Sequence, residues 1–256
     1  MTQENASEVK QNSTPDMKIK NVILNQQDDN TLKAVRKIPR TYRSIRAKSI
    51  NPQGNPIHFE SKLEHDAYIL ICFDFEVANA IEQPVRFEYE NDDGKKRSYT
   101  PDILIEIDHK LDKNQDQRPI LVEVKYHEEL LKDPKRIAEE KEIAEIYCEQ
   151  EDWRFKLITD QDVSQIKLKN VKFLKRFDLI EDKLDFDHEI SPKLLKELSK
   201  GESTPKTLIS KITDSPQDFS NHLPYLWHLI RWKHILINVD KPLTMTSKIW
   251  LKKNKK

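Results

Sequence analysis

Glu123 and Lys125 interrupt a short apolar run, Pro119 to Tyr126, which is typical of a central β-strand. Successive side chains of a strand point to opposite faces, so Glu123 and Lys125 should project together while the neighbouring valines pack against a helix layer. A charge within an apolar strand is costly unless a partner or a metal ion compensates it. Because Glu-x-Lys recurs elsewhere in this highly charged chain, the location of this triplet carries more weight than its residue types.

Asp102 follows Pro101 near the start of the preceding predicted strand, Ser98 to Ile107. Antiparallel pairing of the two strands through the intervening loop would bring Asp102 beside Glu123. Metal-assisted cleavage of a phosphodiester needs carboxylates that hold Mg²⁺, a place for the attacking water and a cation near the developing charge. The residues predict such a site, and the alternative is a structural Glu-Lys pair on an edge strand.

Glu64 lies in the first turn of a predicted helix that begins after Ser61. Ser61 is placed to act as the N-cap, and Glu64 occupies the capping-box position three residues later. From spacing alone, a capping role for Glu64 is favoured over a catalytic one.

A basic segment precedes this helix, because no acidic residue occurs from Thr31 to His58. It is either a solvated arm or a segment that contacts DNA phosphates next to an acidic site. The candidate phosphate contacts are Arg36, Lys37, Arg40, Arg43, Arg46 and Lys48.

The first part of the chain predicts an α/β fold in the order helix, three strands, helix, strand. The region Phe75 to Ile81 is expected to be a connection. After the first helix, the expected elements are strands at Val85 to Tyr89, Ser98 to Ile107 and Pro119 to Tyr126, a helix at Pro134 to Gln150, and a strand at Phe155 to Thr159.

The last part of the chain predicts three helices followed by a hairpin, which is the order of a winged-helix domain. The expected helices are Ser191 to Lys200, Thr204 to Thr213 and Ser215 to Trp232, and the expected strands are His234 to Val239 and Leu243 to Leu251. We therefore divide the chain into a flexible leader (1–30), a nuclease domain with the basic segment (31–165), a winged-helix domain (166–251) and a basic tail (252–256). The leader is expected to be flexible because it is poor in apolar residues.

Composition narrows the class of protein. The net charge is zero, which argues against a polycation that coats nucleic acid without specificity. Cys72 and Cys148 lack the paired spacing of a disulfide framework or a cysteine zinc site. No apolar stretch reaches the roughly 20 residues of a membrane span, and the N-terminus lacks a signal peptide, so a cytoplasmic location without membrane contact is expected.

Four short motifs carry a resemblance to a known family over about residues 40 to 160. They are Phe59-Glu60-Ser61-Lys62-Leu63-Glu64, Gln83-Pro84, Tyr99-Thr100-Pro101-Asp102 and Leu121-Val122-Glu123-Val124-Lys125. With them the chain resembles the TnsA-type endonucleases of multi-component transposons, which have the restriction-endonuclease-like fold of the PD-(D/E)xK nucleases. The C-terminal part is also similar to the winged-helix domain of that family.

The resemblance implies roles for individual residues. Glu64, Asp102 and Glu123, with the Val124 carbonyl, would bind Mg²⁺, for which Mn²⁺ can substitute, and Lys125 would orient or activate the water. The family can have a further acidic residue on the helix after Lys125, a place that Glu145 occupies. His127, two residues beyond Lys125 with the same strand parity, is a further accessory candidate.

The resemblance also implies partners. The chain would cut the 5′ strand at the DNA ends of a transposon, a DDE-type, TnsB-like transposase would act on the 3′ ends, and an AAA+, TnsC-like regulator would bind the C-terminal region. The alternatives are a stand-alone nuclease of restriction or repair type and a non-catalytic DNA-binding assembly adaptor that keeps a nuclease fold.

Overall fold

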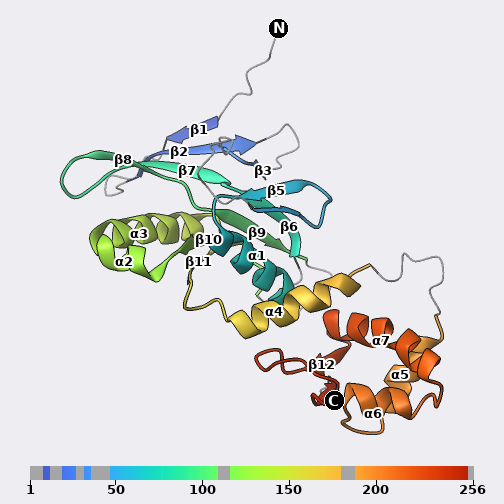
Figure 1. Cartoon of the computed structure of the whole chain (residues 1–256). Helices are drawn as coiled ribbons and strands as arrows, with labels where there is room; N and C mark the ends of the chain where they lie inside the picture. The colour runs from blue at the N-terminus through green and yellow to red at the C-terminus, as the bar shows by residue number, and fades with distance from the viewer. Residues whose placement is uncertain are drawn as a thin grey trace. The chain divides into compact units, whose positions relative to one another are not determined.

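The computed structural model describes residues 8–11, 19–26, 32–35, 47–75, 77–108, 116–179 and 188–252 (Figure 1). The chain divides into two units, Met1–Val163 and Ser164–Lys256. Of the basic residues predicted to contact phosphates, only Lys48 is described. Arg36, Lys37, Arg40, Arg43 and Arg46 lie outside the described residues, as does most of the tail, 253–256.

The first unit contains a five-stranded antiparallel sheet with the order β1-β2-β7-β8, in which β3 also pairs with β2. The strands are β1 (Glu8–Gln11), β2 (Ile19–Gln26), β3 (Leu32–Lys33), β7 (Val85–Glu90) and β8 (Lys96–Tyr99). The prediction of a flexible leader over residues 1–30 is therefore wrong for β1 and β2. The segment is polar on average, but β2 carries the buried apolar residues Ile19, Val22 and Leu24, which the average composition does not reveal.

A second, four-stranded sheet has the order β11-β10-β9-β6. It consists of β6 (Val77–Glu82), β9 (Ile103–Ile107), β10 (Ile120–Lys125) and β11 (Arg154–Thr159). β10 pairs with β11 in parallel and with β9 antiparallel. The region predicted to be a connection forms β6 instead, because Ala80 and Ile81 are buried in a strand that pairs with β9.

The single strand predicted from Ser98 to Ile107 is in fact two strands in different sheets, β8 and β9. Pro101 separates them, because it has no amide N–H to donate to a ladder. Immediately after it, the amide of Asp102 donates to the carbonyl of Val122 at 3.2 Å, so the chain enters the second sheet at Asp102.

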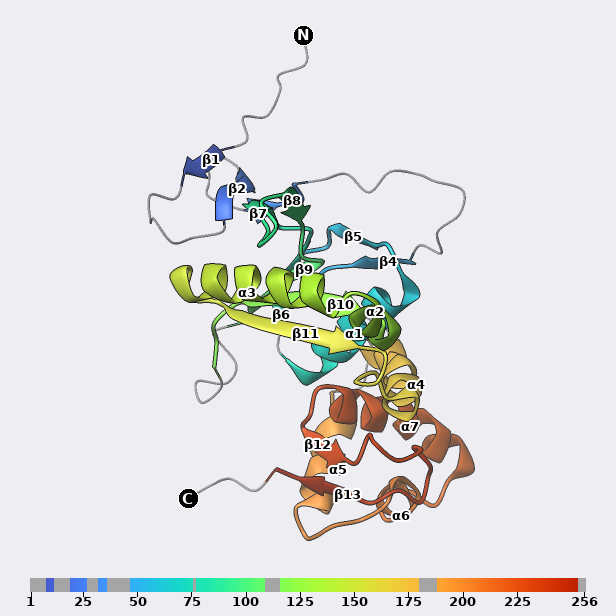
Figure 2. The ribbon, with the colours of Figure 1, turned by 90° about the vertical axis from the view of Figure 1, so that its left-hand side faces the viewer.

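Three helices accompany the sheets of this unit: α1 (Lys62–Asp74), α2 (His127–Lys132) and α3 (Pro134–Gln150). The predictions of α1 and α3 are confirmed, whereas α2 was not predicted. Ser61 caps α1 as expected, since its side chain accepts from the amide of Glu64 at 3.1 Å. A hairpin of β4 (Ala47–Ile50) and β5 (Pro56–Phe59) leads into α1. Figure 2 shows α3 running along the sheet that contains β10 and β11.

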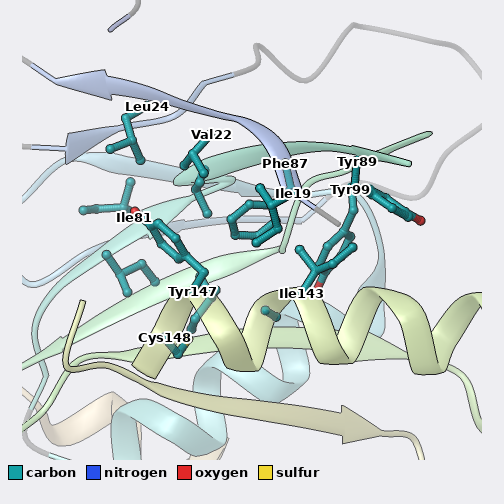
Figure 3. Close-up of a cluster of buried hydrophobic side chains, with 14 residues drawn as sticks. Ile19, Val22, Leu24, Ile81, Phe87, Tyr89, Tyr99, Ile143, Tyr147 and Cys148 are labelled. Atoms are coloured by element: carbon teal, nitrogen blue, oxygen red, sulfur yellow. The ribbon is translucent and has the colours of Figure 1, made fainter. Parts of the chain in front are cut away.

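One buried core joins the five-stranded sheet to α3 (Figure 3). Val22, Phe87 and Tyr99 from the sheet lie with Ile143 and Tyr147 from the helix. The rings of Phe87 and Tyr147 meet edge to face at a centroid distance of 5.1 Å. β2 is thus an integral part of this unit.

The second unit contains the three predicted helices and an antiparallel strand pair, together with α4 and a short 3₁₀ helix, η1, which were not predicted. Its elements are α4 (Gln165–Leu174), η1 (Lys175–Phe177), α5 (Ile190–Leu198), α6 (Pro205–Ser210), α7 (Pro216–Arg231), β12 (Ile235–Ile237) and β13 (Ile249–Leu251). Asn170 anchors the loop between the strands, because its side-chain amide donates to the carbonyls of Val239 and Lys241, both at 2.8 Å. The strand predicted from Leu243 to Leu251 is confirmed only for Ile249–Leu251, because residues 243–248 belong to the loop that Asn170 holds. The winged-helix assignment stays a prediction.

Candidate active site

Asp102 and the end of β10 lie side by side, as the antiparallel pairing predicted. The ladder between β9 and β10 runs as far as Ile103 opposite Val122, so Asp102 comes next beside the continuing strand. There the amide of Val124 donates to Oδ2 of Asp102 at 2.7 Å. In a strand the N–H and C=O of one residue point to the same side, so the Val124 carbonyl also faces the side of Asp102.

Glu123 is buried, with 4% of its surface exposed, and both of its carboxylate oxygens have partners. Oε2 accepts a hydrogen bond from the hydroxyl of Tyr99 at 3.0 Å. Oε1 forms an ion pair with Nζ of Lys125. Since Lys125 lies two residues along the strand, this pair confirms that the two side chains project from the same face of β10.

The acidic side chain of α3 that comes near Lys125 is Glu140. Its Oε2 lies 4.0 Å from Nζ of Lys125, and its Oε1 accepts from Arg136 at 2.9 Å. The candidate Glu145 is placed elsewhere: it pairs with Lys141 at 3.6 Å, and both side chains are about half exposed. Five residues along a helix correspond to a rotation of roughly 140° from the starting face, which separates Glu145 from the face that carries Glu140.

Glu64 is a buried residue of the first turn of α1. Its Oε2 accepts from the amide of Glu60 at 2.8 Å, so it satisfies free backbone donors at the helix start, as a cap should. Its charge also contributes to raising the pKa of Asp102, so the two carboxylates lie within electrostatic range of each other. The capping role and the place beside the other carboxylates are therefore compatible.

Gln83 and Pro84 link β6 to β7 and hold the backbone around the site. Gln83 is buried and has a φ of 44°, a left-handed conformation that is uncommon outside glycine. Its amide donates to the carbonyl of Asp102 at 2.7 Å, and its side chain donates to Glu60 at 3.2 Å. This turn, one of the four motifs quoted above, ties the start of β9 to the segment before α1.

The surroundings of Asp102, Glu64 and Glu123 disfavour the ionised form of all three carboxyl groups, so their pKa values are raised. Burial raises the pKa of Asp102 well above its usual range, and the charges of Glu123 and Glu64 raise it further, although the Asp102 side chain keeps some exposure. Burial also raises the pKa of Glu64, and it raises that of Glu123 to about 7 although Lys125 opposes this shift. Burial acts to lower the pKa of Lys125, but the charge and hydrogen bond of Glu123, together with the charges of Asp102 and Glu140, outweigh it, so the pKa is raised. The cluster is short of positive charge.

This shortage and the donor chemistry fit a hard divalent cation such as Mg²⁺, which prefers carboxylate and carbonyl oxygens. Among the residues that the structure describes, no three His, Cys, Asp or Glu side chains are arranged as a ready-made metal site. In this structure three of the carboxylate oxygens are instead held by protein groups: Lys125 pairs with one oxygen of Glu123, and the amides of Val124 and Glu60 donate to Asp102 and Glu64.

The other sequence candidates lie around the site or apart from it. β10 ends at Lys125, so His127 does not project from the same strand face as Lys125. Instead it begins α2, and its amide donates to Asp160 at 2.6 Å. Lys48 is exposed on β4, where it lies opposite His58.

Tyr99 and Glu140 are site residues that sequence reasoning missed. Glu140 had a signal, because it falls on the periodic apolar stripe of α3 with Ile137 and Ala144, where a glutamate is unexpected. Tyr99 belongs to a motif already quoted, but its contact with Glu123 depends on the crossing between two sheets, which no local pattern reveals.

Two family models match consecutive parts of the chain. Residues 74–160 match the model described as TnsA-like endonuclease N terminal, and residues 162–239 match the one described as TnsA endonuclease C terminal. The chain belongs to the TnsA-type transposon endonuclease family. The first TnsA match contains Asp102, Glu123 and Lys125 and begins after Glu64. The two matches meet close to the division between the two units, at Val163.

Membership of the TnsA family makes the chain a DNA endonuclease that works in transposition. No individual curated protein matches the chain. In the part of the chain that the structure describes, no helix is both long and apolar enough to cross a membrane.

Proposed function

We propose that this TnsA-type chain is a Mg²⁺-dependent endonuclease subunit of a heteromeric transposase and cuts the 5′ strand at the transposon ends. The observation that carries the proposal is the pair of Asp102 and Glu123 on adjacent strands beside Lys125. Burial raises the pKa of both carboxyl groups, and the charges of Glu123 and Glu64 raise that of Asp102 further, so a bound divalent cation would stabilise the ionised forms.

Glu64, Asp102, Glu123 and the Val124 carbonyl would hold the cation, and Mn²⁺ can take the place of Mg²⁺. When bound, the cation neutralises charge that develops on the phosphate oxygens and favours deprotonation of the attacking water.

The other roles belong to groups with defined contacts. The Val124 amide fixes the carboxylate of Asp102 against the strand. The Lys125 ammonium, which contacts Glu123 and lies 4.0 Å from Glu140, would orient the attacking water. Only 16% of the Lys125 side chain is exposed, so burial limits the positions that its ammonium group can take.

Partners complete the proposed reaction. A DDE-type, TnsB-like transposase would recognise the end sequences and act on the 3′ ends, and an AAA+, TnsC-like regulator would bind the C-terminal unit. The basic segment that includes Lys48 would contact the phosphates of the transposon end. These assignments rest on the family, whose role is in a DNA transposition complex.

The test is strand-specific cleavage of labelled transposon ends by the full chain together with its transposase. Asp102→Ala and Lys125→Ala should each lower 5′-strand cutting by about a hundredfold or more, while cutting of the 3′ strand continues. Glu145→Ala is a matched control, since it removes a carboxylate from an exposed position on α3. Chelation by EDTA should stop 5′ cutting, and added Mg²⁺ or Mn²⁺ should restore it.

Two results would contradict the proposal. Unchanged 5′ cutting by both variants would remove the catalytic assignment and favour the assembly adaptor. Efficient metal-dependent cutting by the purified chain alone would favour a stand-alone nuclease.

A further inference from the structure

Tyr99 connects the core of the five-stranded sheet to the candidate active site. It is the last residue of β8, and its ring lies in the buried core, 5.8 Å from the ring of Phe87. Only 5% of its surface is exposed. From this position its hydroxyl reaches the other sheet and donates to Oε2 of Glu123 at 3.0 Å.

The ring and the hydroxyl of Tyr99 have separable uses. The core contact with Phe87 needs only an aromatic ring, which phenylalanine would supply equally well. The hydroxyl has a single O–H to donate, and it gives this to Glu123. With Lys125 on Oε1 and Tyr99 on Oε2, the carboxylate is held from two sides, so its orientation is fixed before any ligand arrives.

We infer that Tyr99 is a positioning residue of the nuclease, whose hydroxyl orients the Glu123 carboxylate for binding of the divalent cation. The inference rests on the proposed function, because it presupposes that Glu123 binds the cation. Hydrogen-bond partners of ligating carboxylates fix their orientation, and losing such a partner costs about 10- to 100-fold in metal affinity or activity. Tyr99 would do this from the core that includes β2 and β7.

The experiment compares Tyr99→Phe with Tyr147→Phe in the full chain, using calorimetric titration with Mn²⁺ in the absence of DNA. Tyr147 is a matched control, because it is buried in the same core, contacts Phe87 and is not one of the two partners of Glu123. We expect the Kd for Mn²⁺ to rise about tenfold or more in Tyr99→Phe. Tyr147→Phe should keep the wild-type Kd. Thermal unfolding of both metal-free variants checks that the fold is intact.

A second pair of variants shows whether Tyr99 acts through Glu123. In a Glu123→Ala background, Tyr99→Phe should produce no further loss of Mn²⁺ affinity, because the group that it positions is gone. An equal loss in both backgrounds would overturn the inference, and so would a wild-type Kd in Tyr99→Phe.

Failure of the Tyr99 role and failure of the proposed function give different binding results. If the wild type binds Mn²⁺ and Asp102→Ala weakens the binding but Tyr99→Phe does not, only the inference about Tyr99 falls. If the wild type shows no Asp102-dependent binding, the proposed function falls and the inference falls with it.

Discussion

Replacing Glu123 with glutamine should change how the stability of the metal-free protein depends on pH. Burial raises the pKa of Glu123 from 4.5 to about 7, so the folded state binds this proton more tightly than the unfolded state. The stability that protonated Glu123 contributes is therefore fully present below pH 4.5 and is lost as the pH rises through about 7. Glutamine stays neutral and removes this loss.

The magnitude follows from the two pKa values. Each pH unit between them corresponds to about 1.4 kcal/mol, so ionisation of Glu123 costs the folded protein roughly 3 kcal/mol above pH 7. Glutamine fills nearly the same volume, but only its carbonyl oxygen can accept a hydrogen bond. Its NH₂ group donates, so the side chain cannot accept from both neighbours as the carboxylate does. We therefore expect Glu123→Gln to increase the free energy of unfolding by about 2 to 3 kcal/mol at pH 8 and to change it little at pH 4.5.

The assay is urea unfolding in EDTA at both pH values. Because the chain has two units, the first unit is followed separately by pulse-labelling hydrogen exchange of peptides from β9 and β10. Glu145→Gln, at an exposed position, should leave both curves unchanged. A gain in stability that is equal at the two pH values, or a loss at pH 8, would refute the reasoning from burial.

Three further outcomes are expected. Glu140→Gln removes a buried charge 4.0 Å from Lys125 and should lower the rate of 5′-strand cutting about tenfold, while the Kd for Mn²⁺ changes little. Unchanged cutting would exclude a role for Glu140. Phe87→Ala should destabilise the first unit by about 3 to 5 kcal/mol in the hydrogen-exchange assay, because it opens a cavity between the five-stranded sheet and α3; a loss below about 1 kcal/mol would mean that this sheet is not part of the core. Asn170→Ala should lower the stability of the second unit by about 2 kcal/mol, because it leaves two loop carbonyls without their donor, and calorimetry should show the transition of the first unit in place.

The elements that could be predicted from the sequence are those with local signals. Ser61 and Pro134 mark the starts of α1 and α3, because capping side chains and a first-turn proline act within a few residues. β10 was predicted from its apolar run, and its charged residues made Glu123 and Lys125 stand out. The site could be predicted to this extent because strand parity and antiparallel pairing are themselves local rules.

The remaining features depend on contacts between distant segments. β2 is a strand because β7 pairs with it and its apolar side chains lie in the shared core, and β6 is one because β9 pairs with it. The place of Glu140 follows from the docking of α3 on the sheet, which decides which turn of the helix meets Lys125. Periodicity predicts that a helix has an inner face, but it does not say which strand residue that face will meet.

The crossing from β8 to β9 leaves the chain no slack. Only Thr100 and Pro101 separate Tyr99, the last residue of β8 in one sheet, from Asp102, which directly precedes β9 in the other. The three backbone steps from Tyr99 to Asp102 span at most about 11 Å, so an insertion or a shift of the first sheet would displace both contacts to the strand of Glu123 and Val124 at once. In an exchange of segments between relatives, the five-stranded sheet and the four-stranded sheet would therefore have to be transferred together. A chimera that takes only the segment from Asp102 onward would keep Asp102 but lose the paired Tyr99 contact with Glu123.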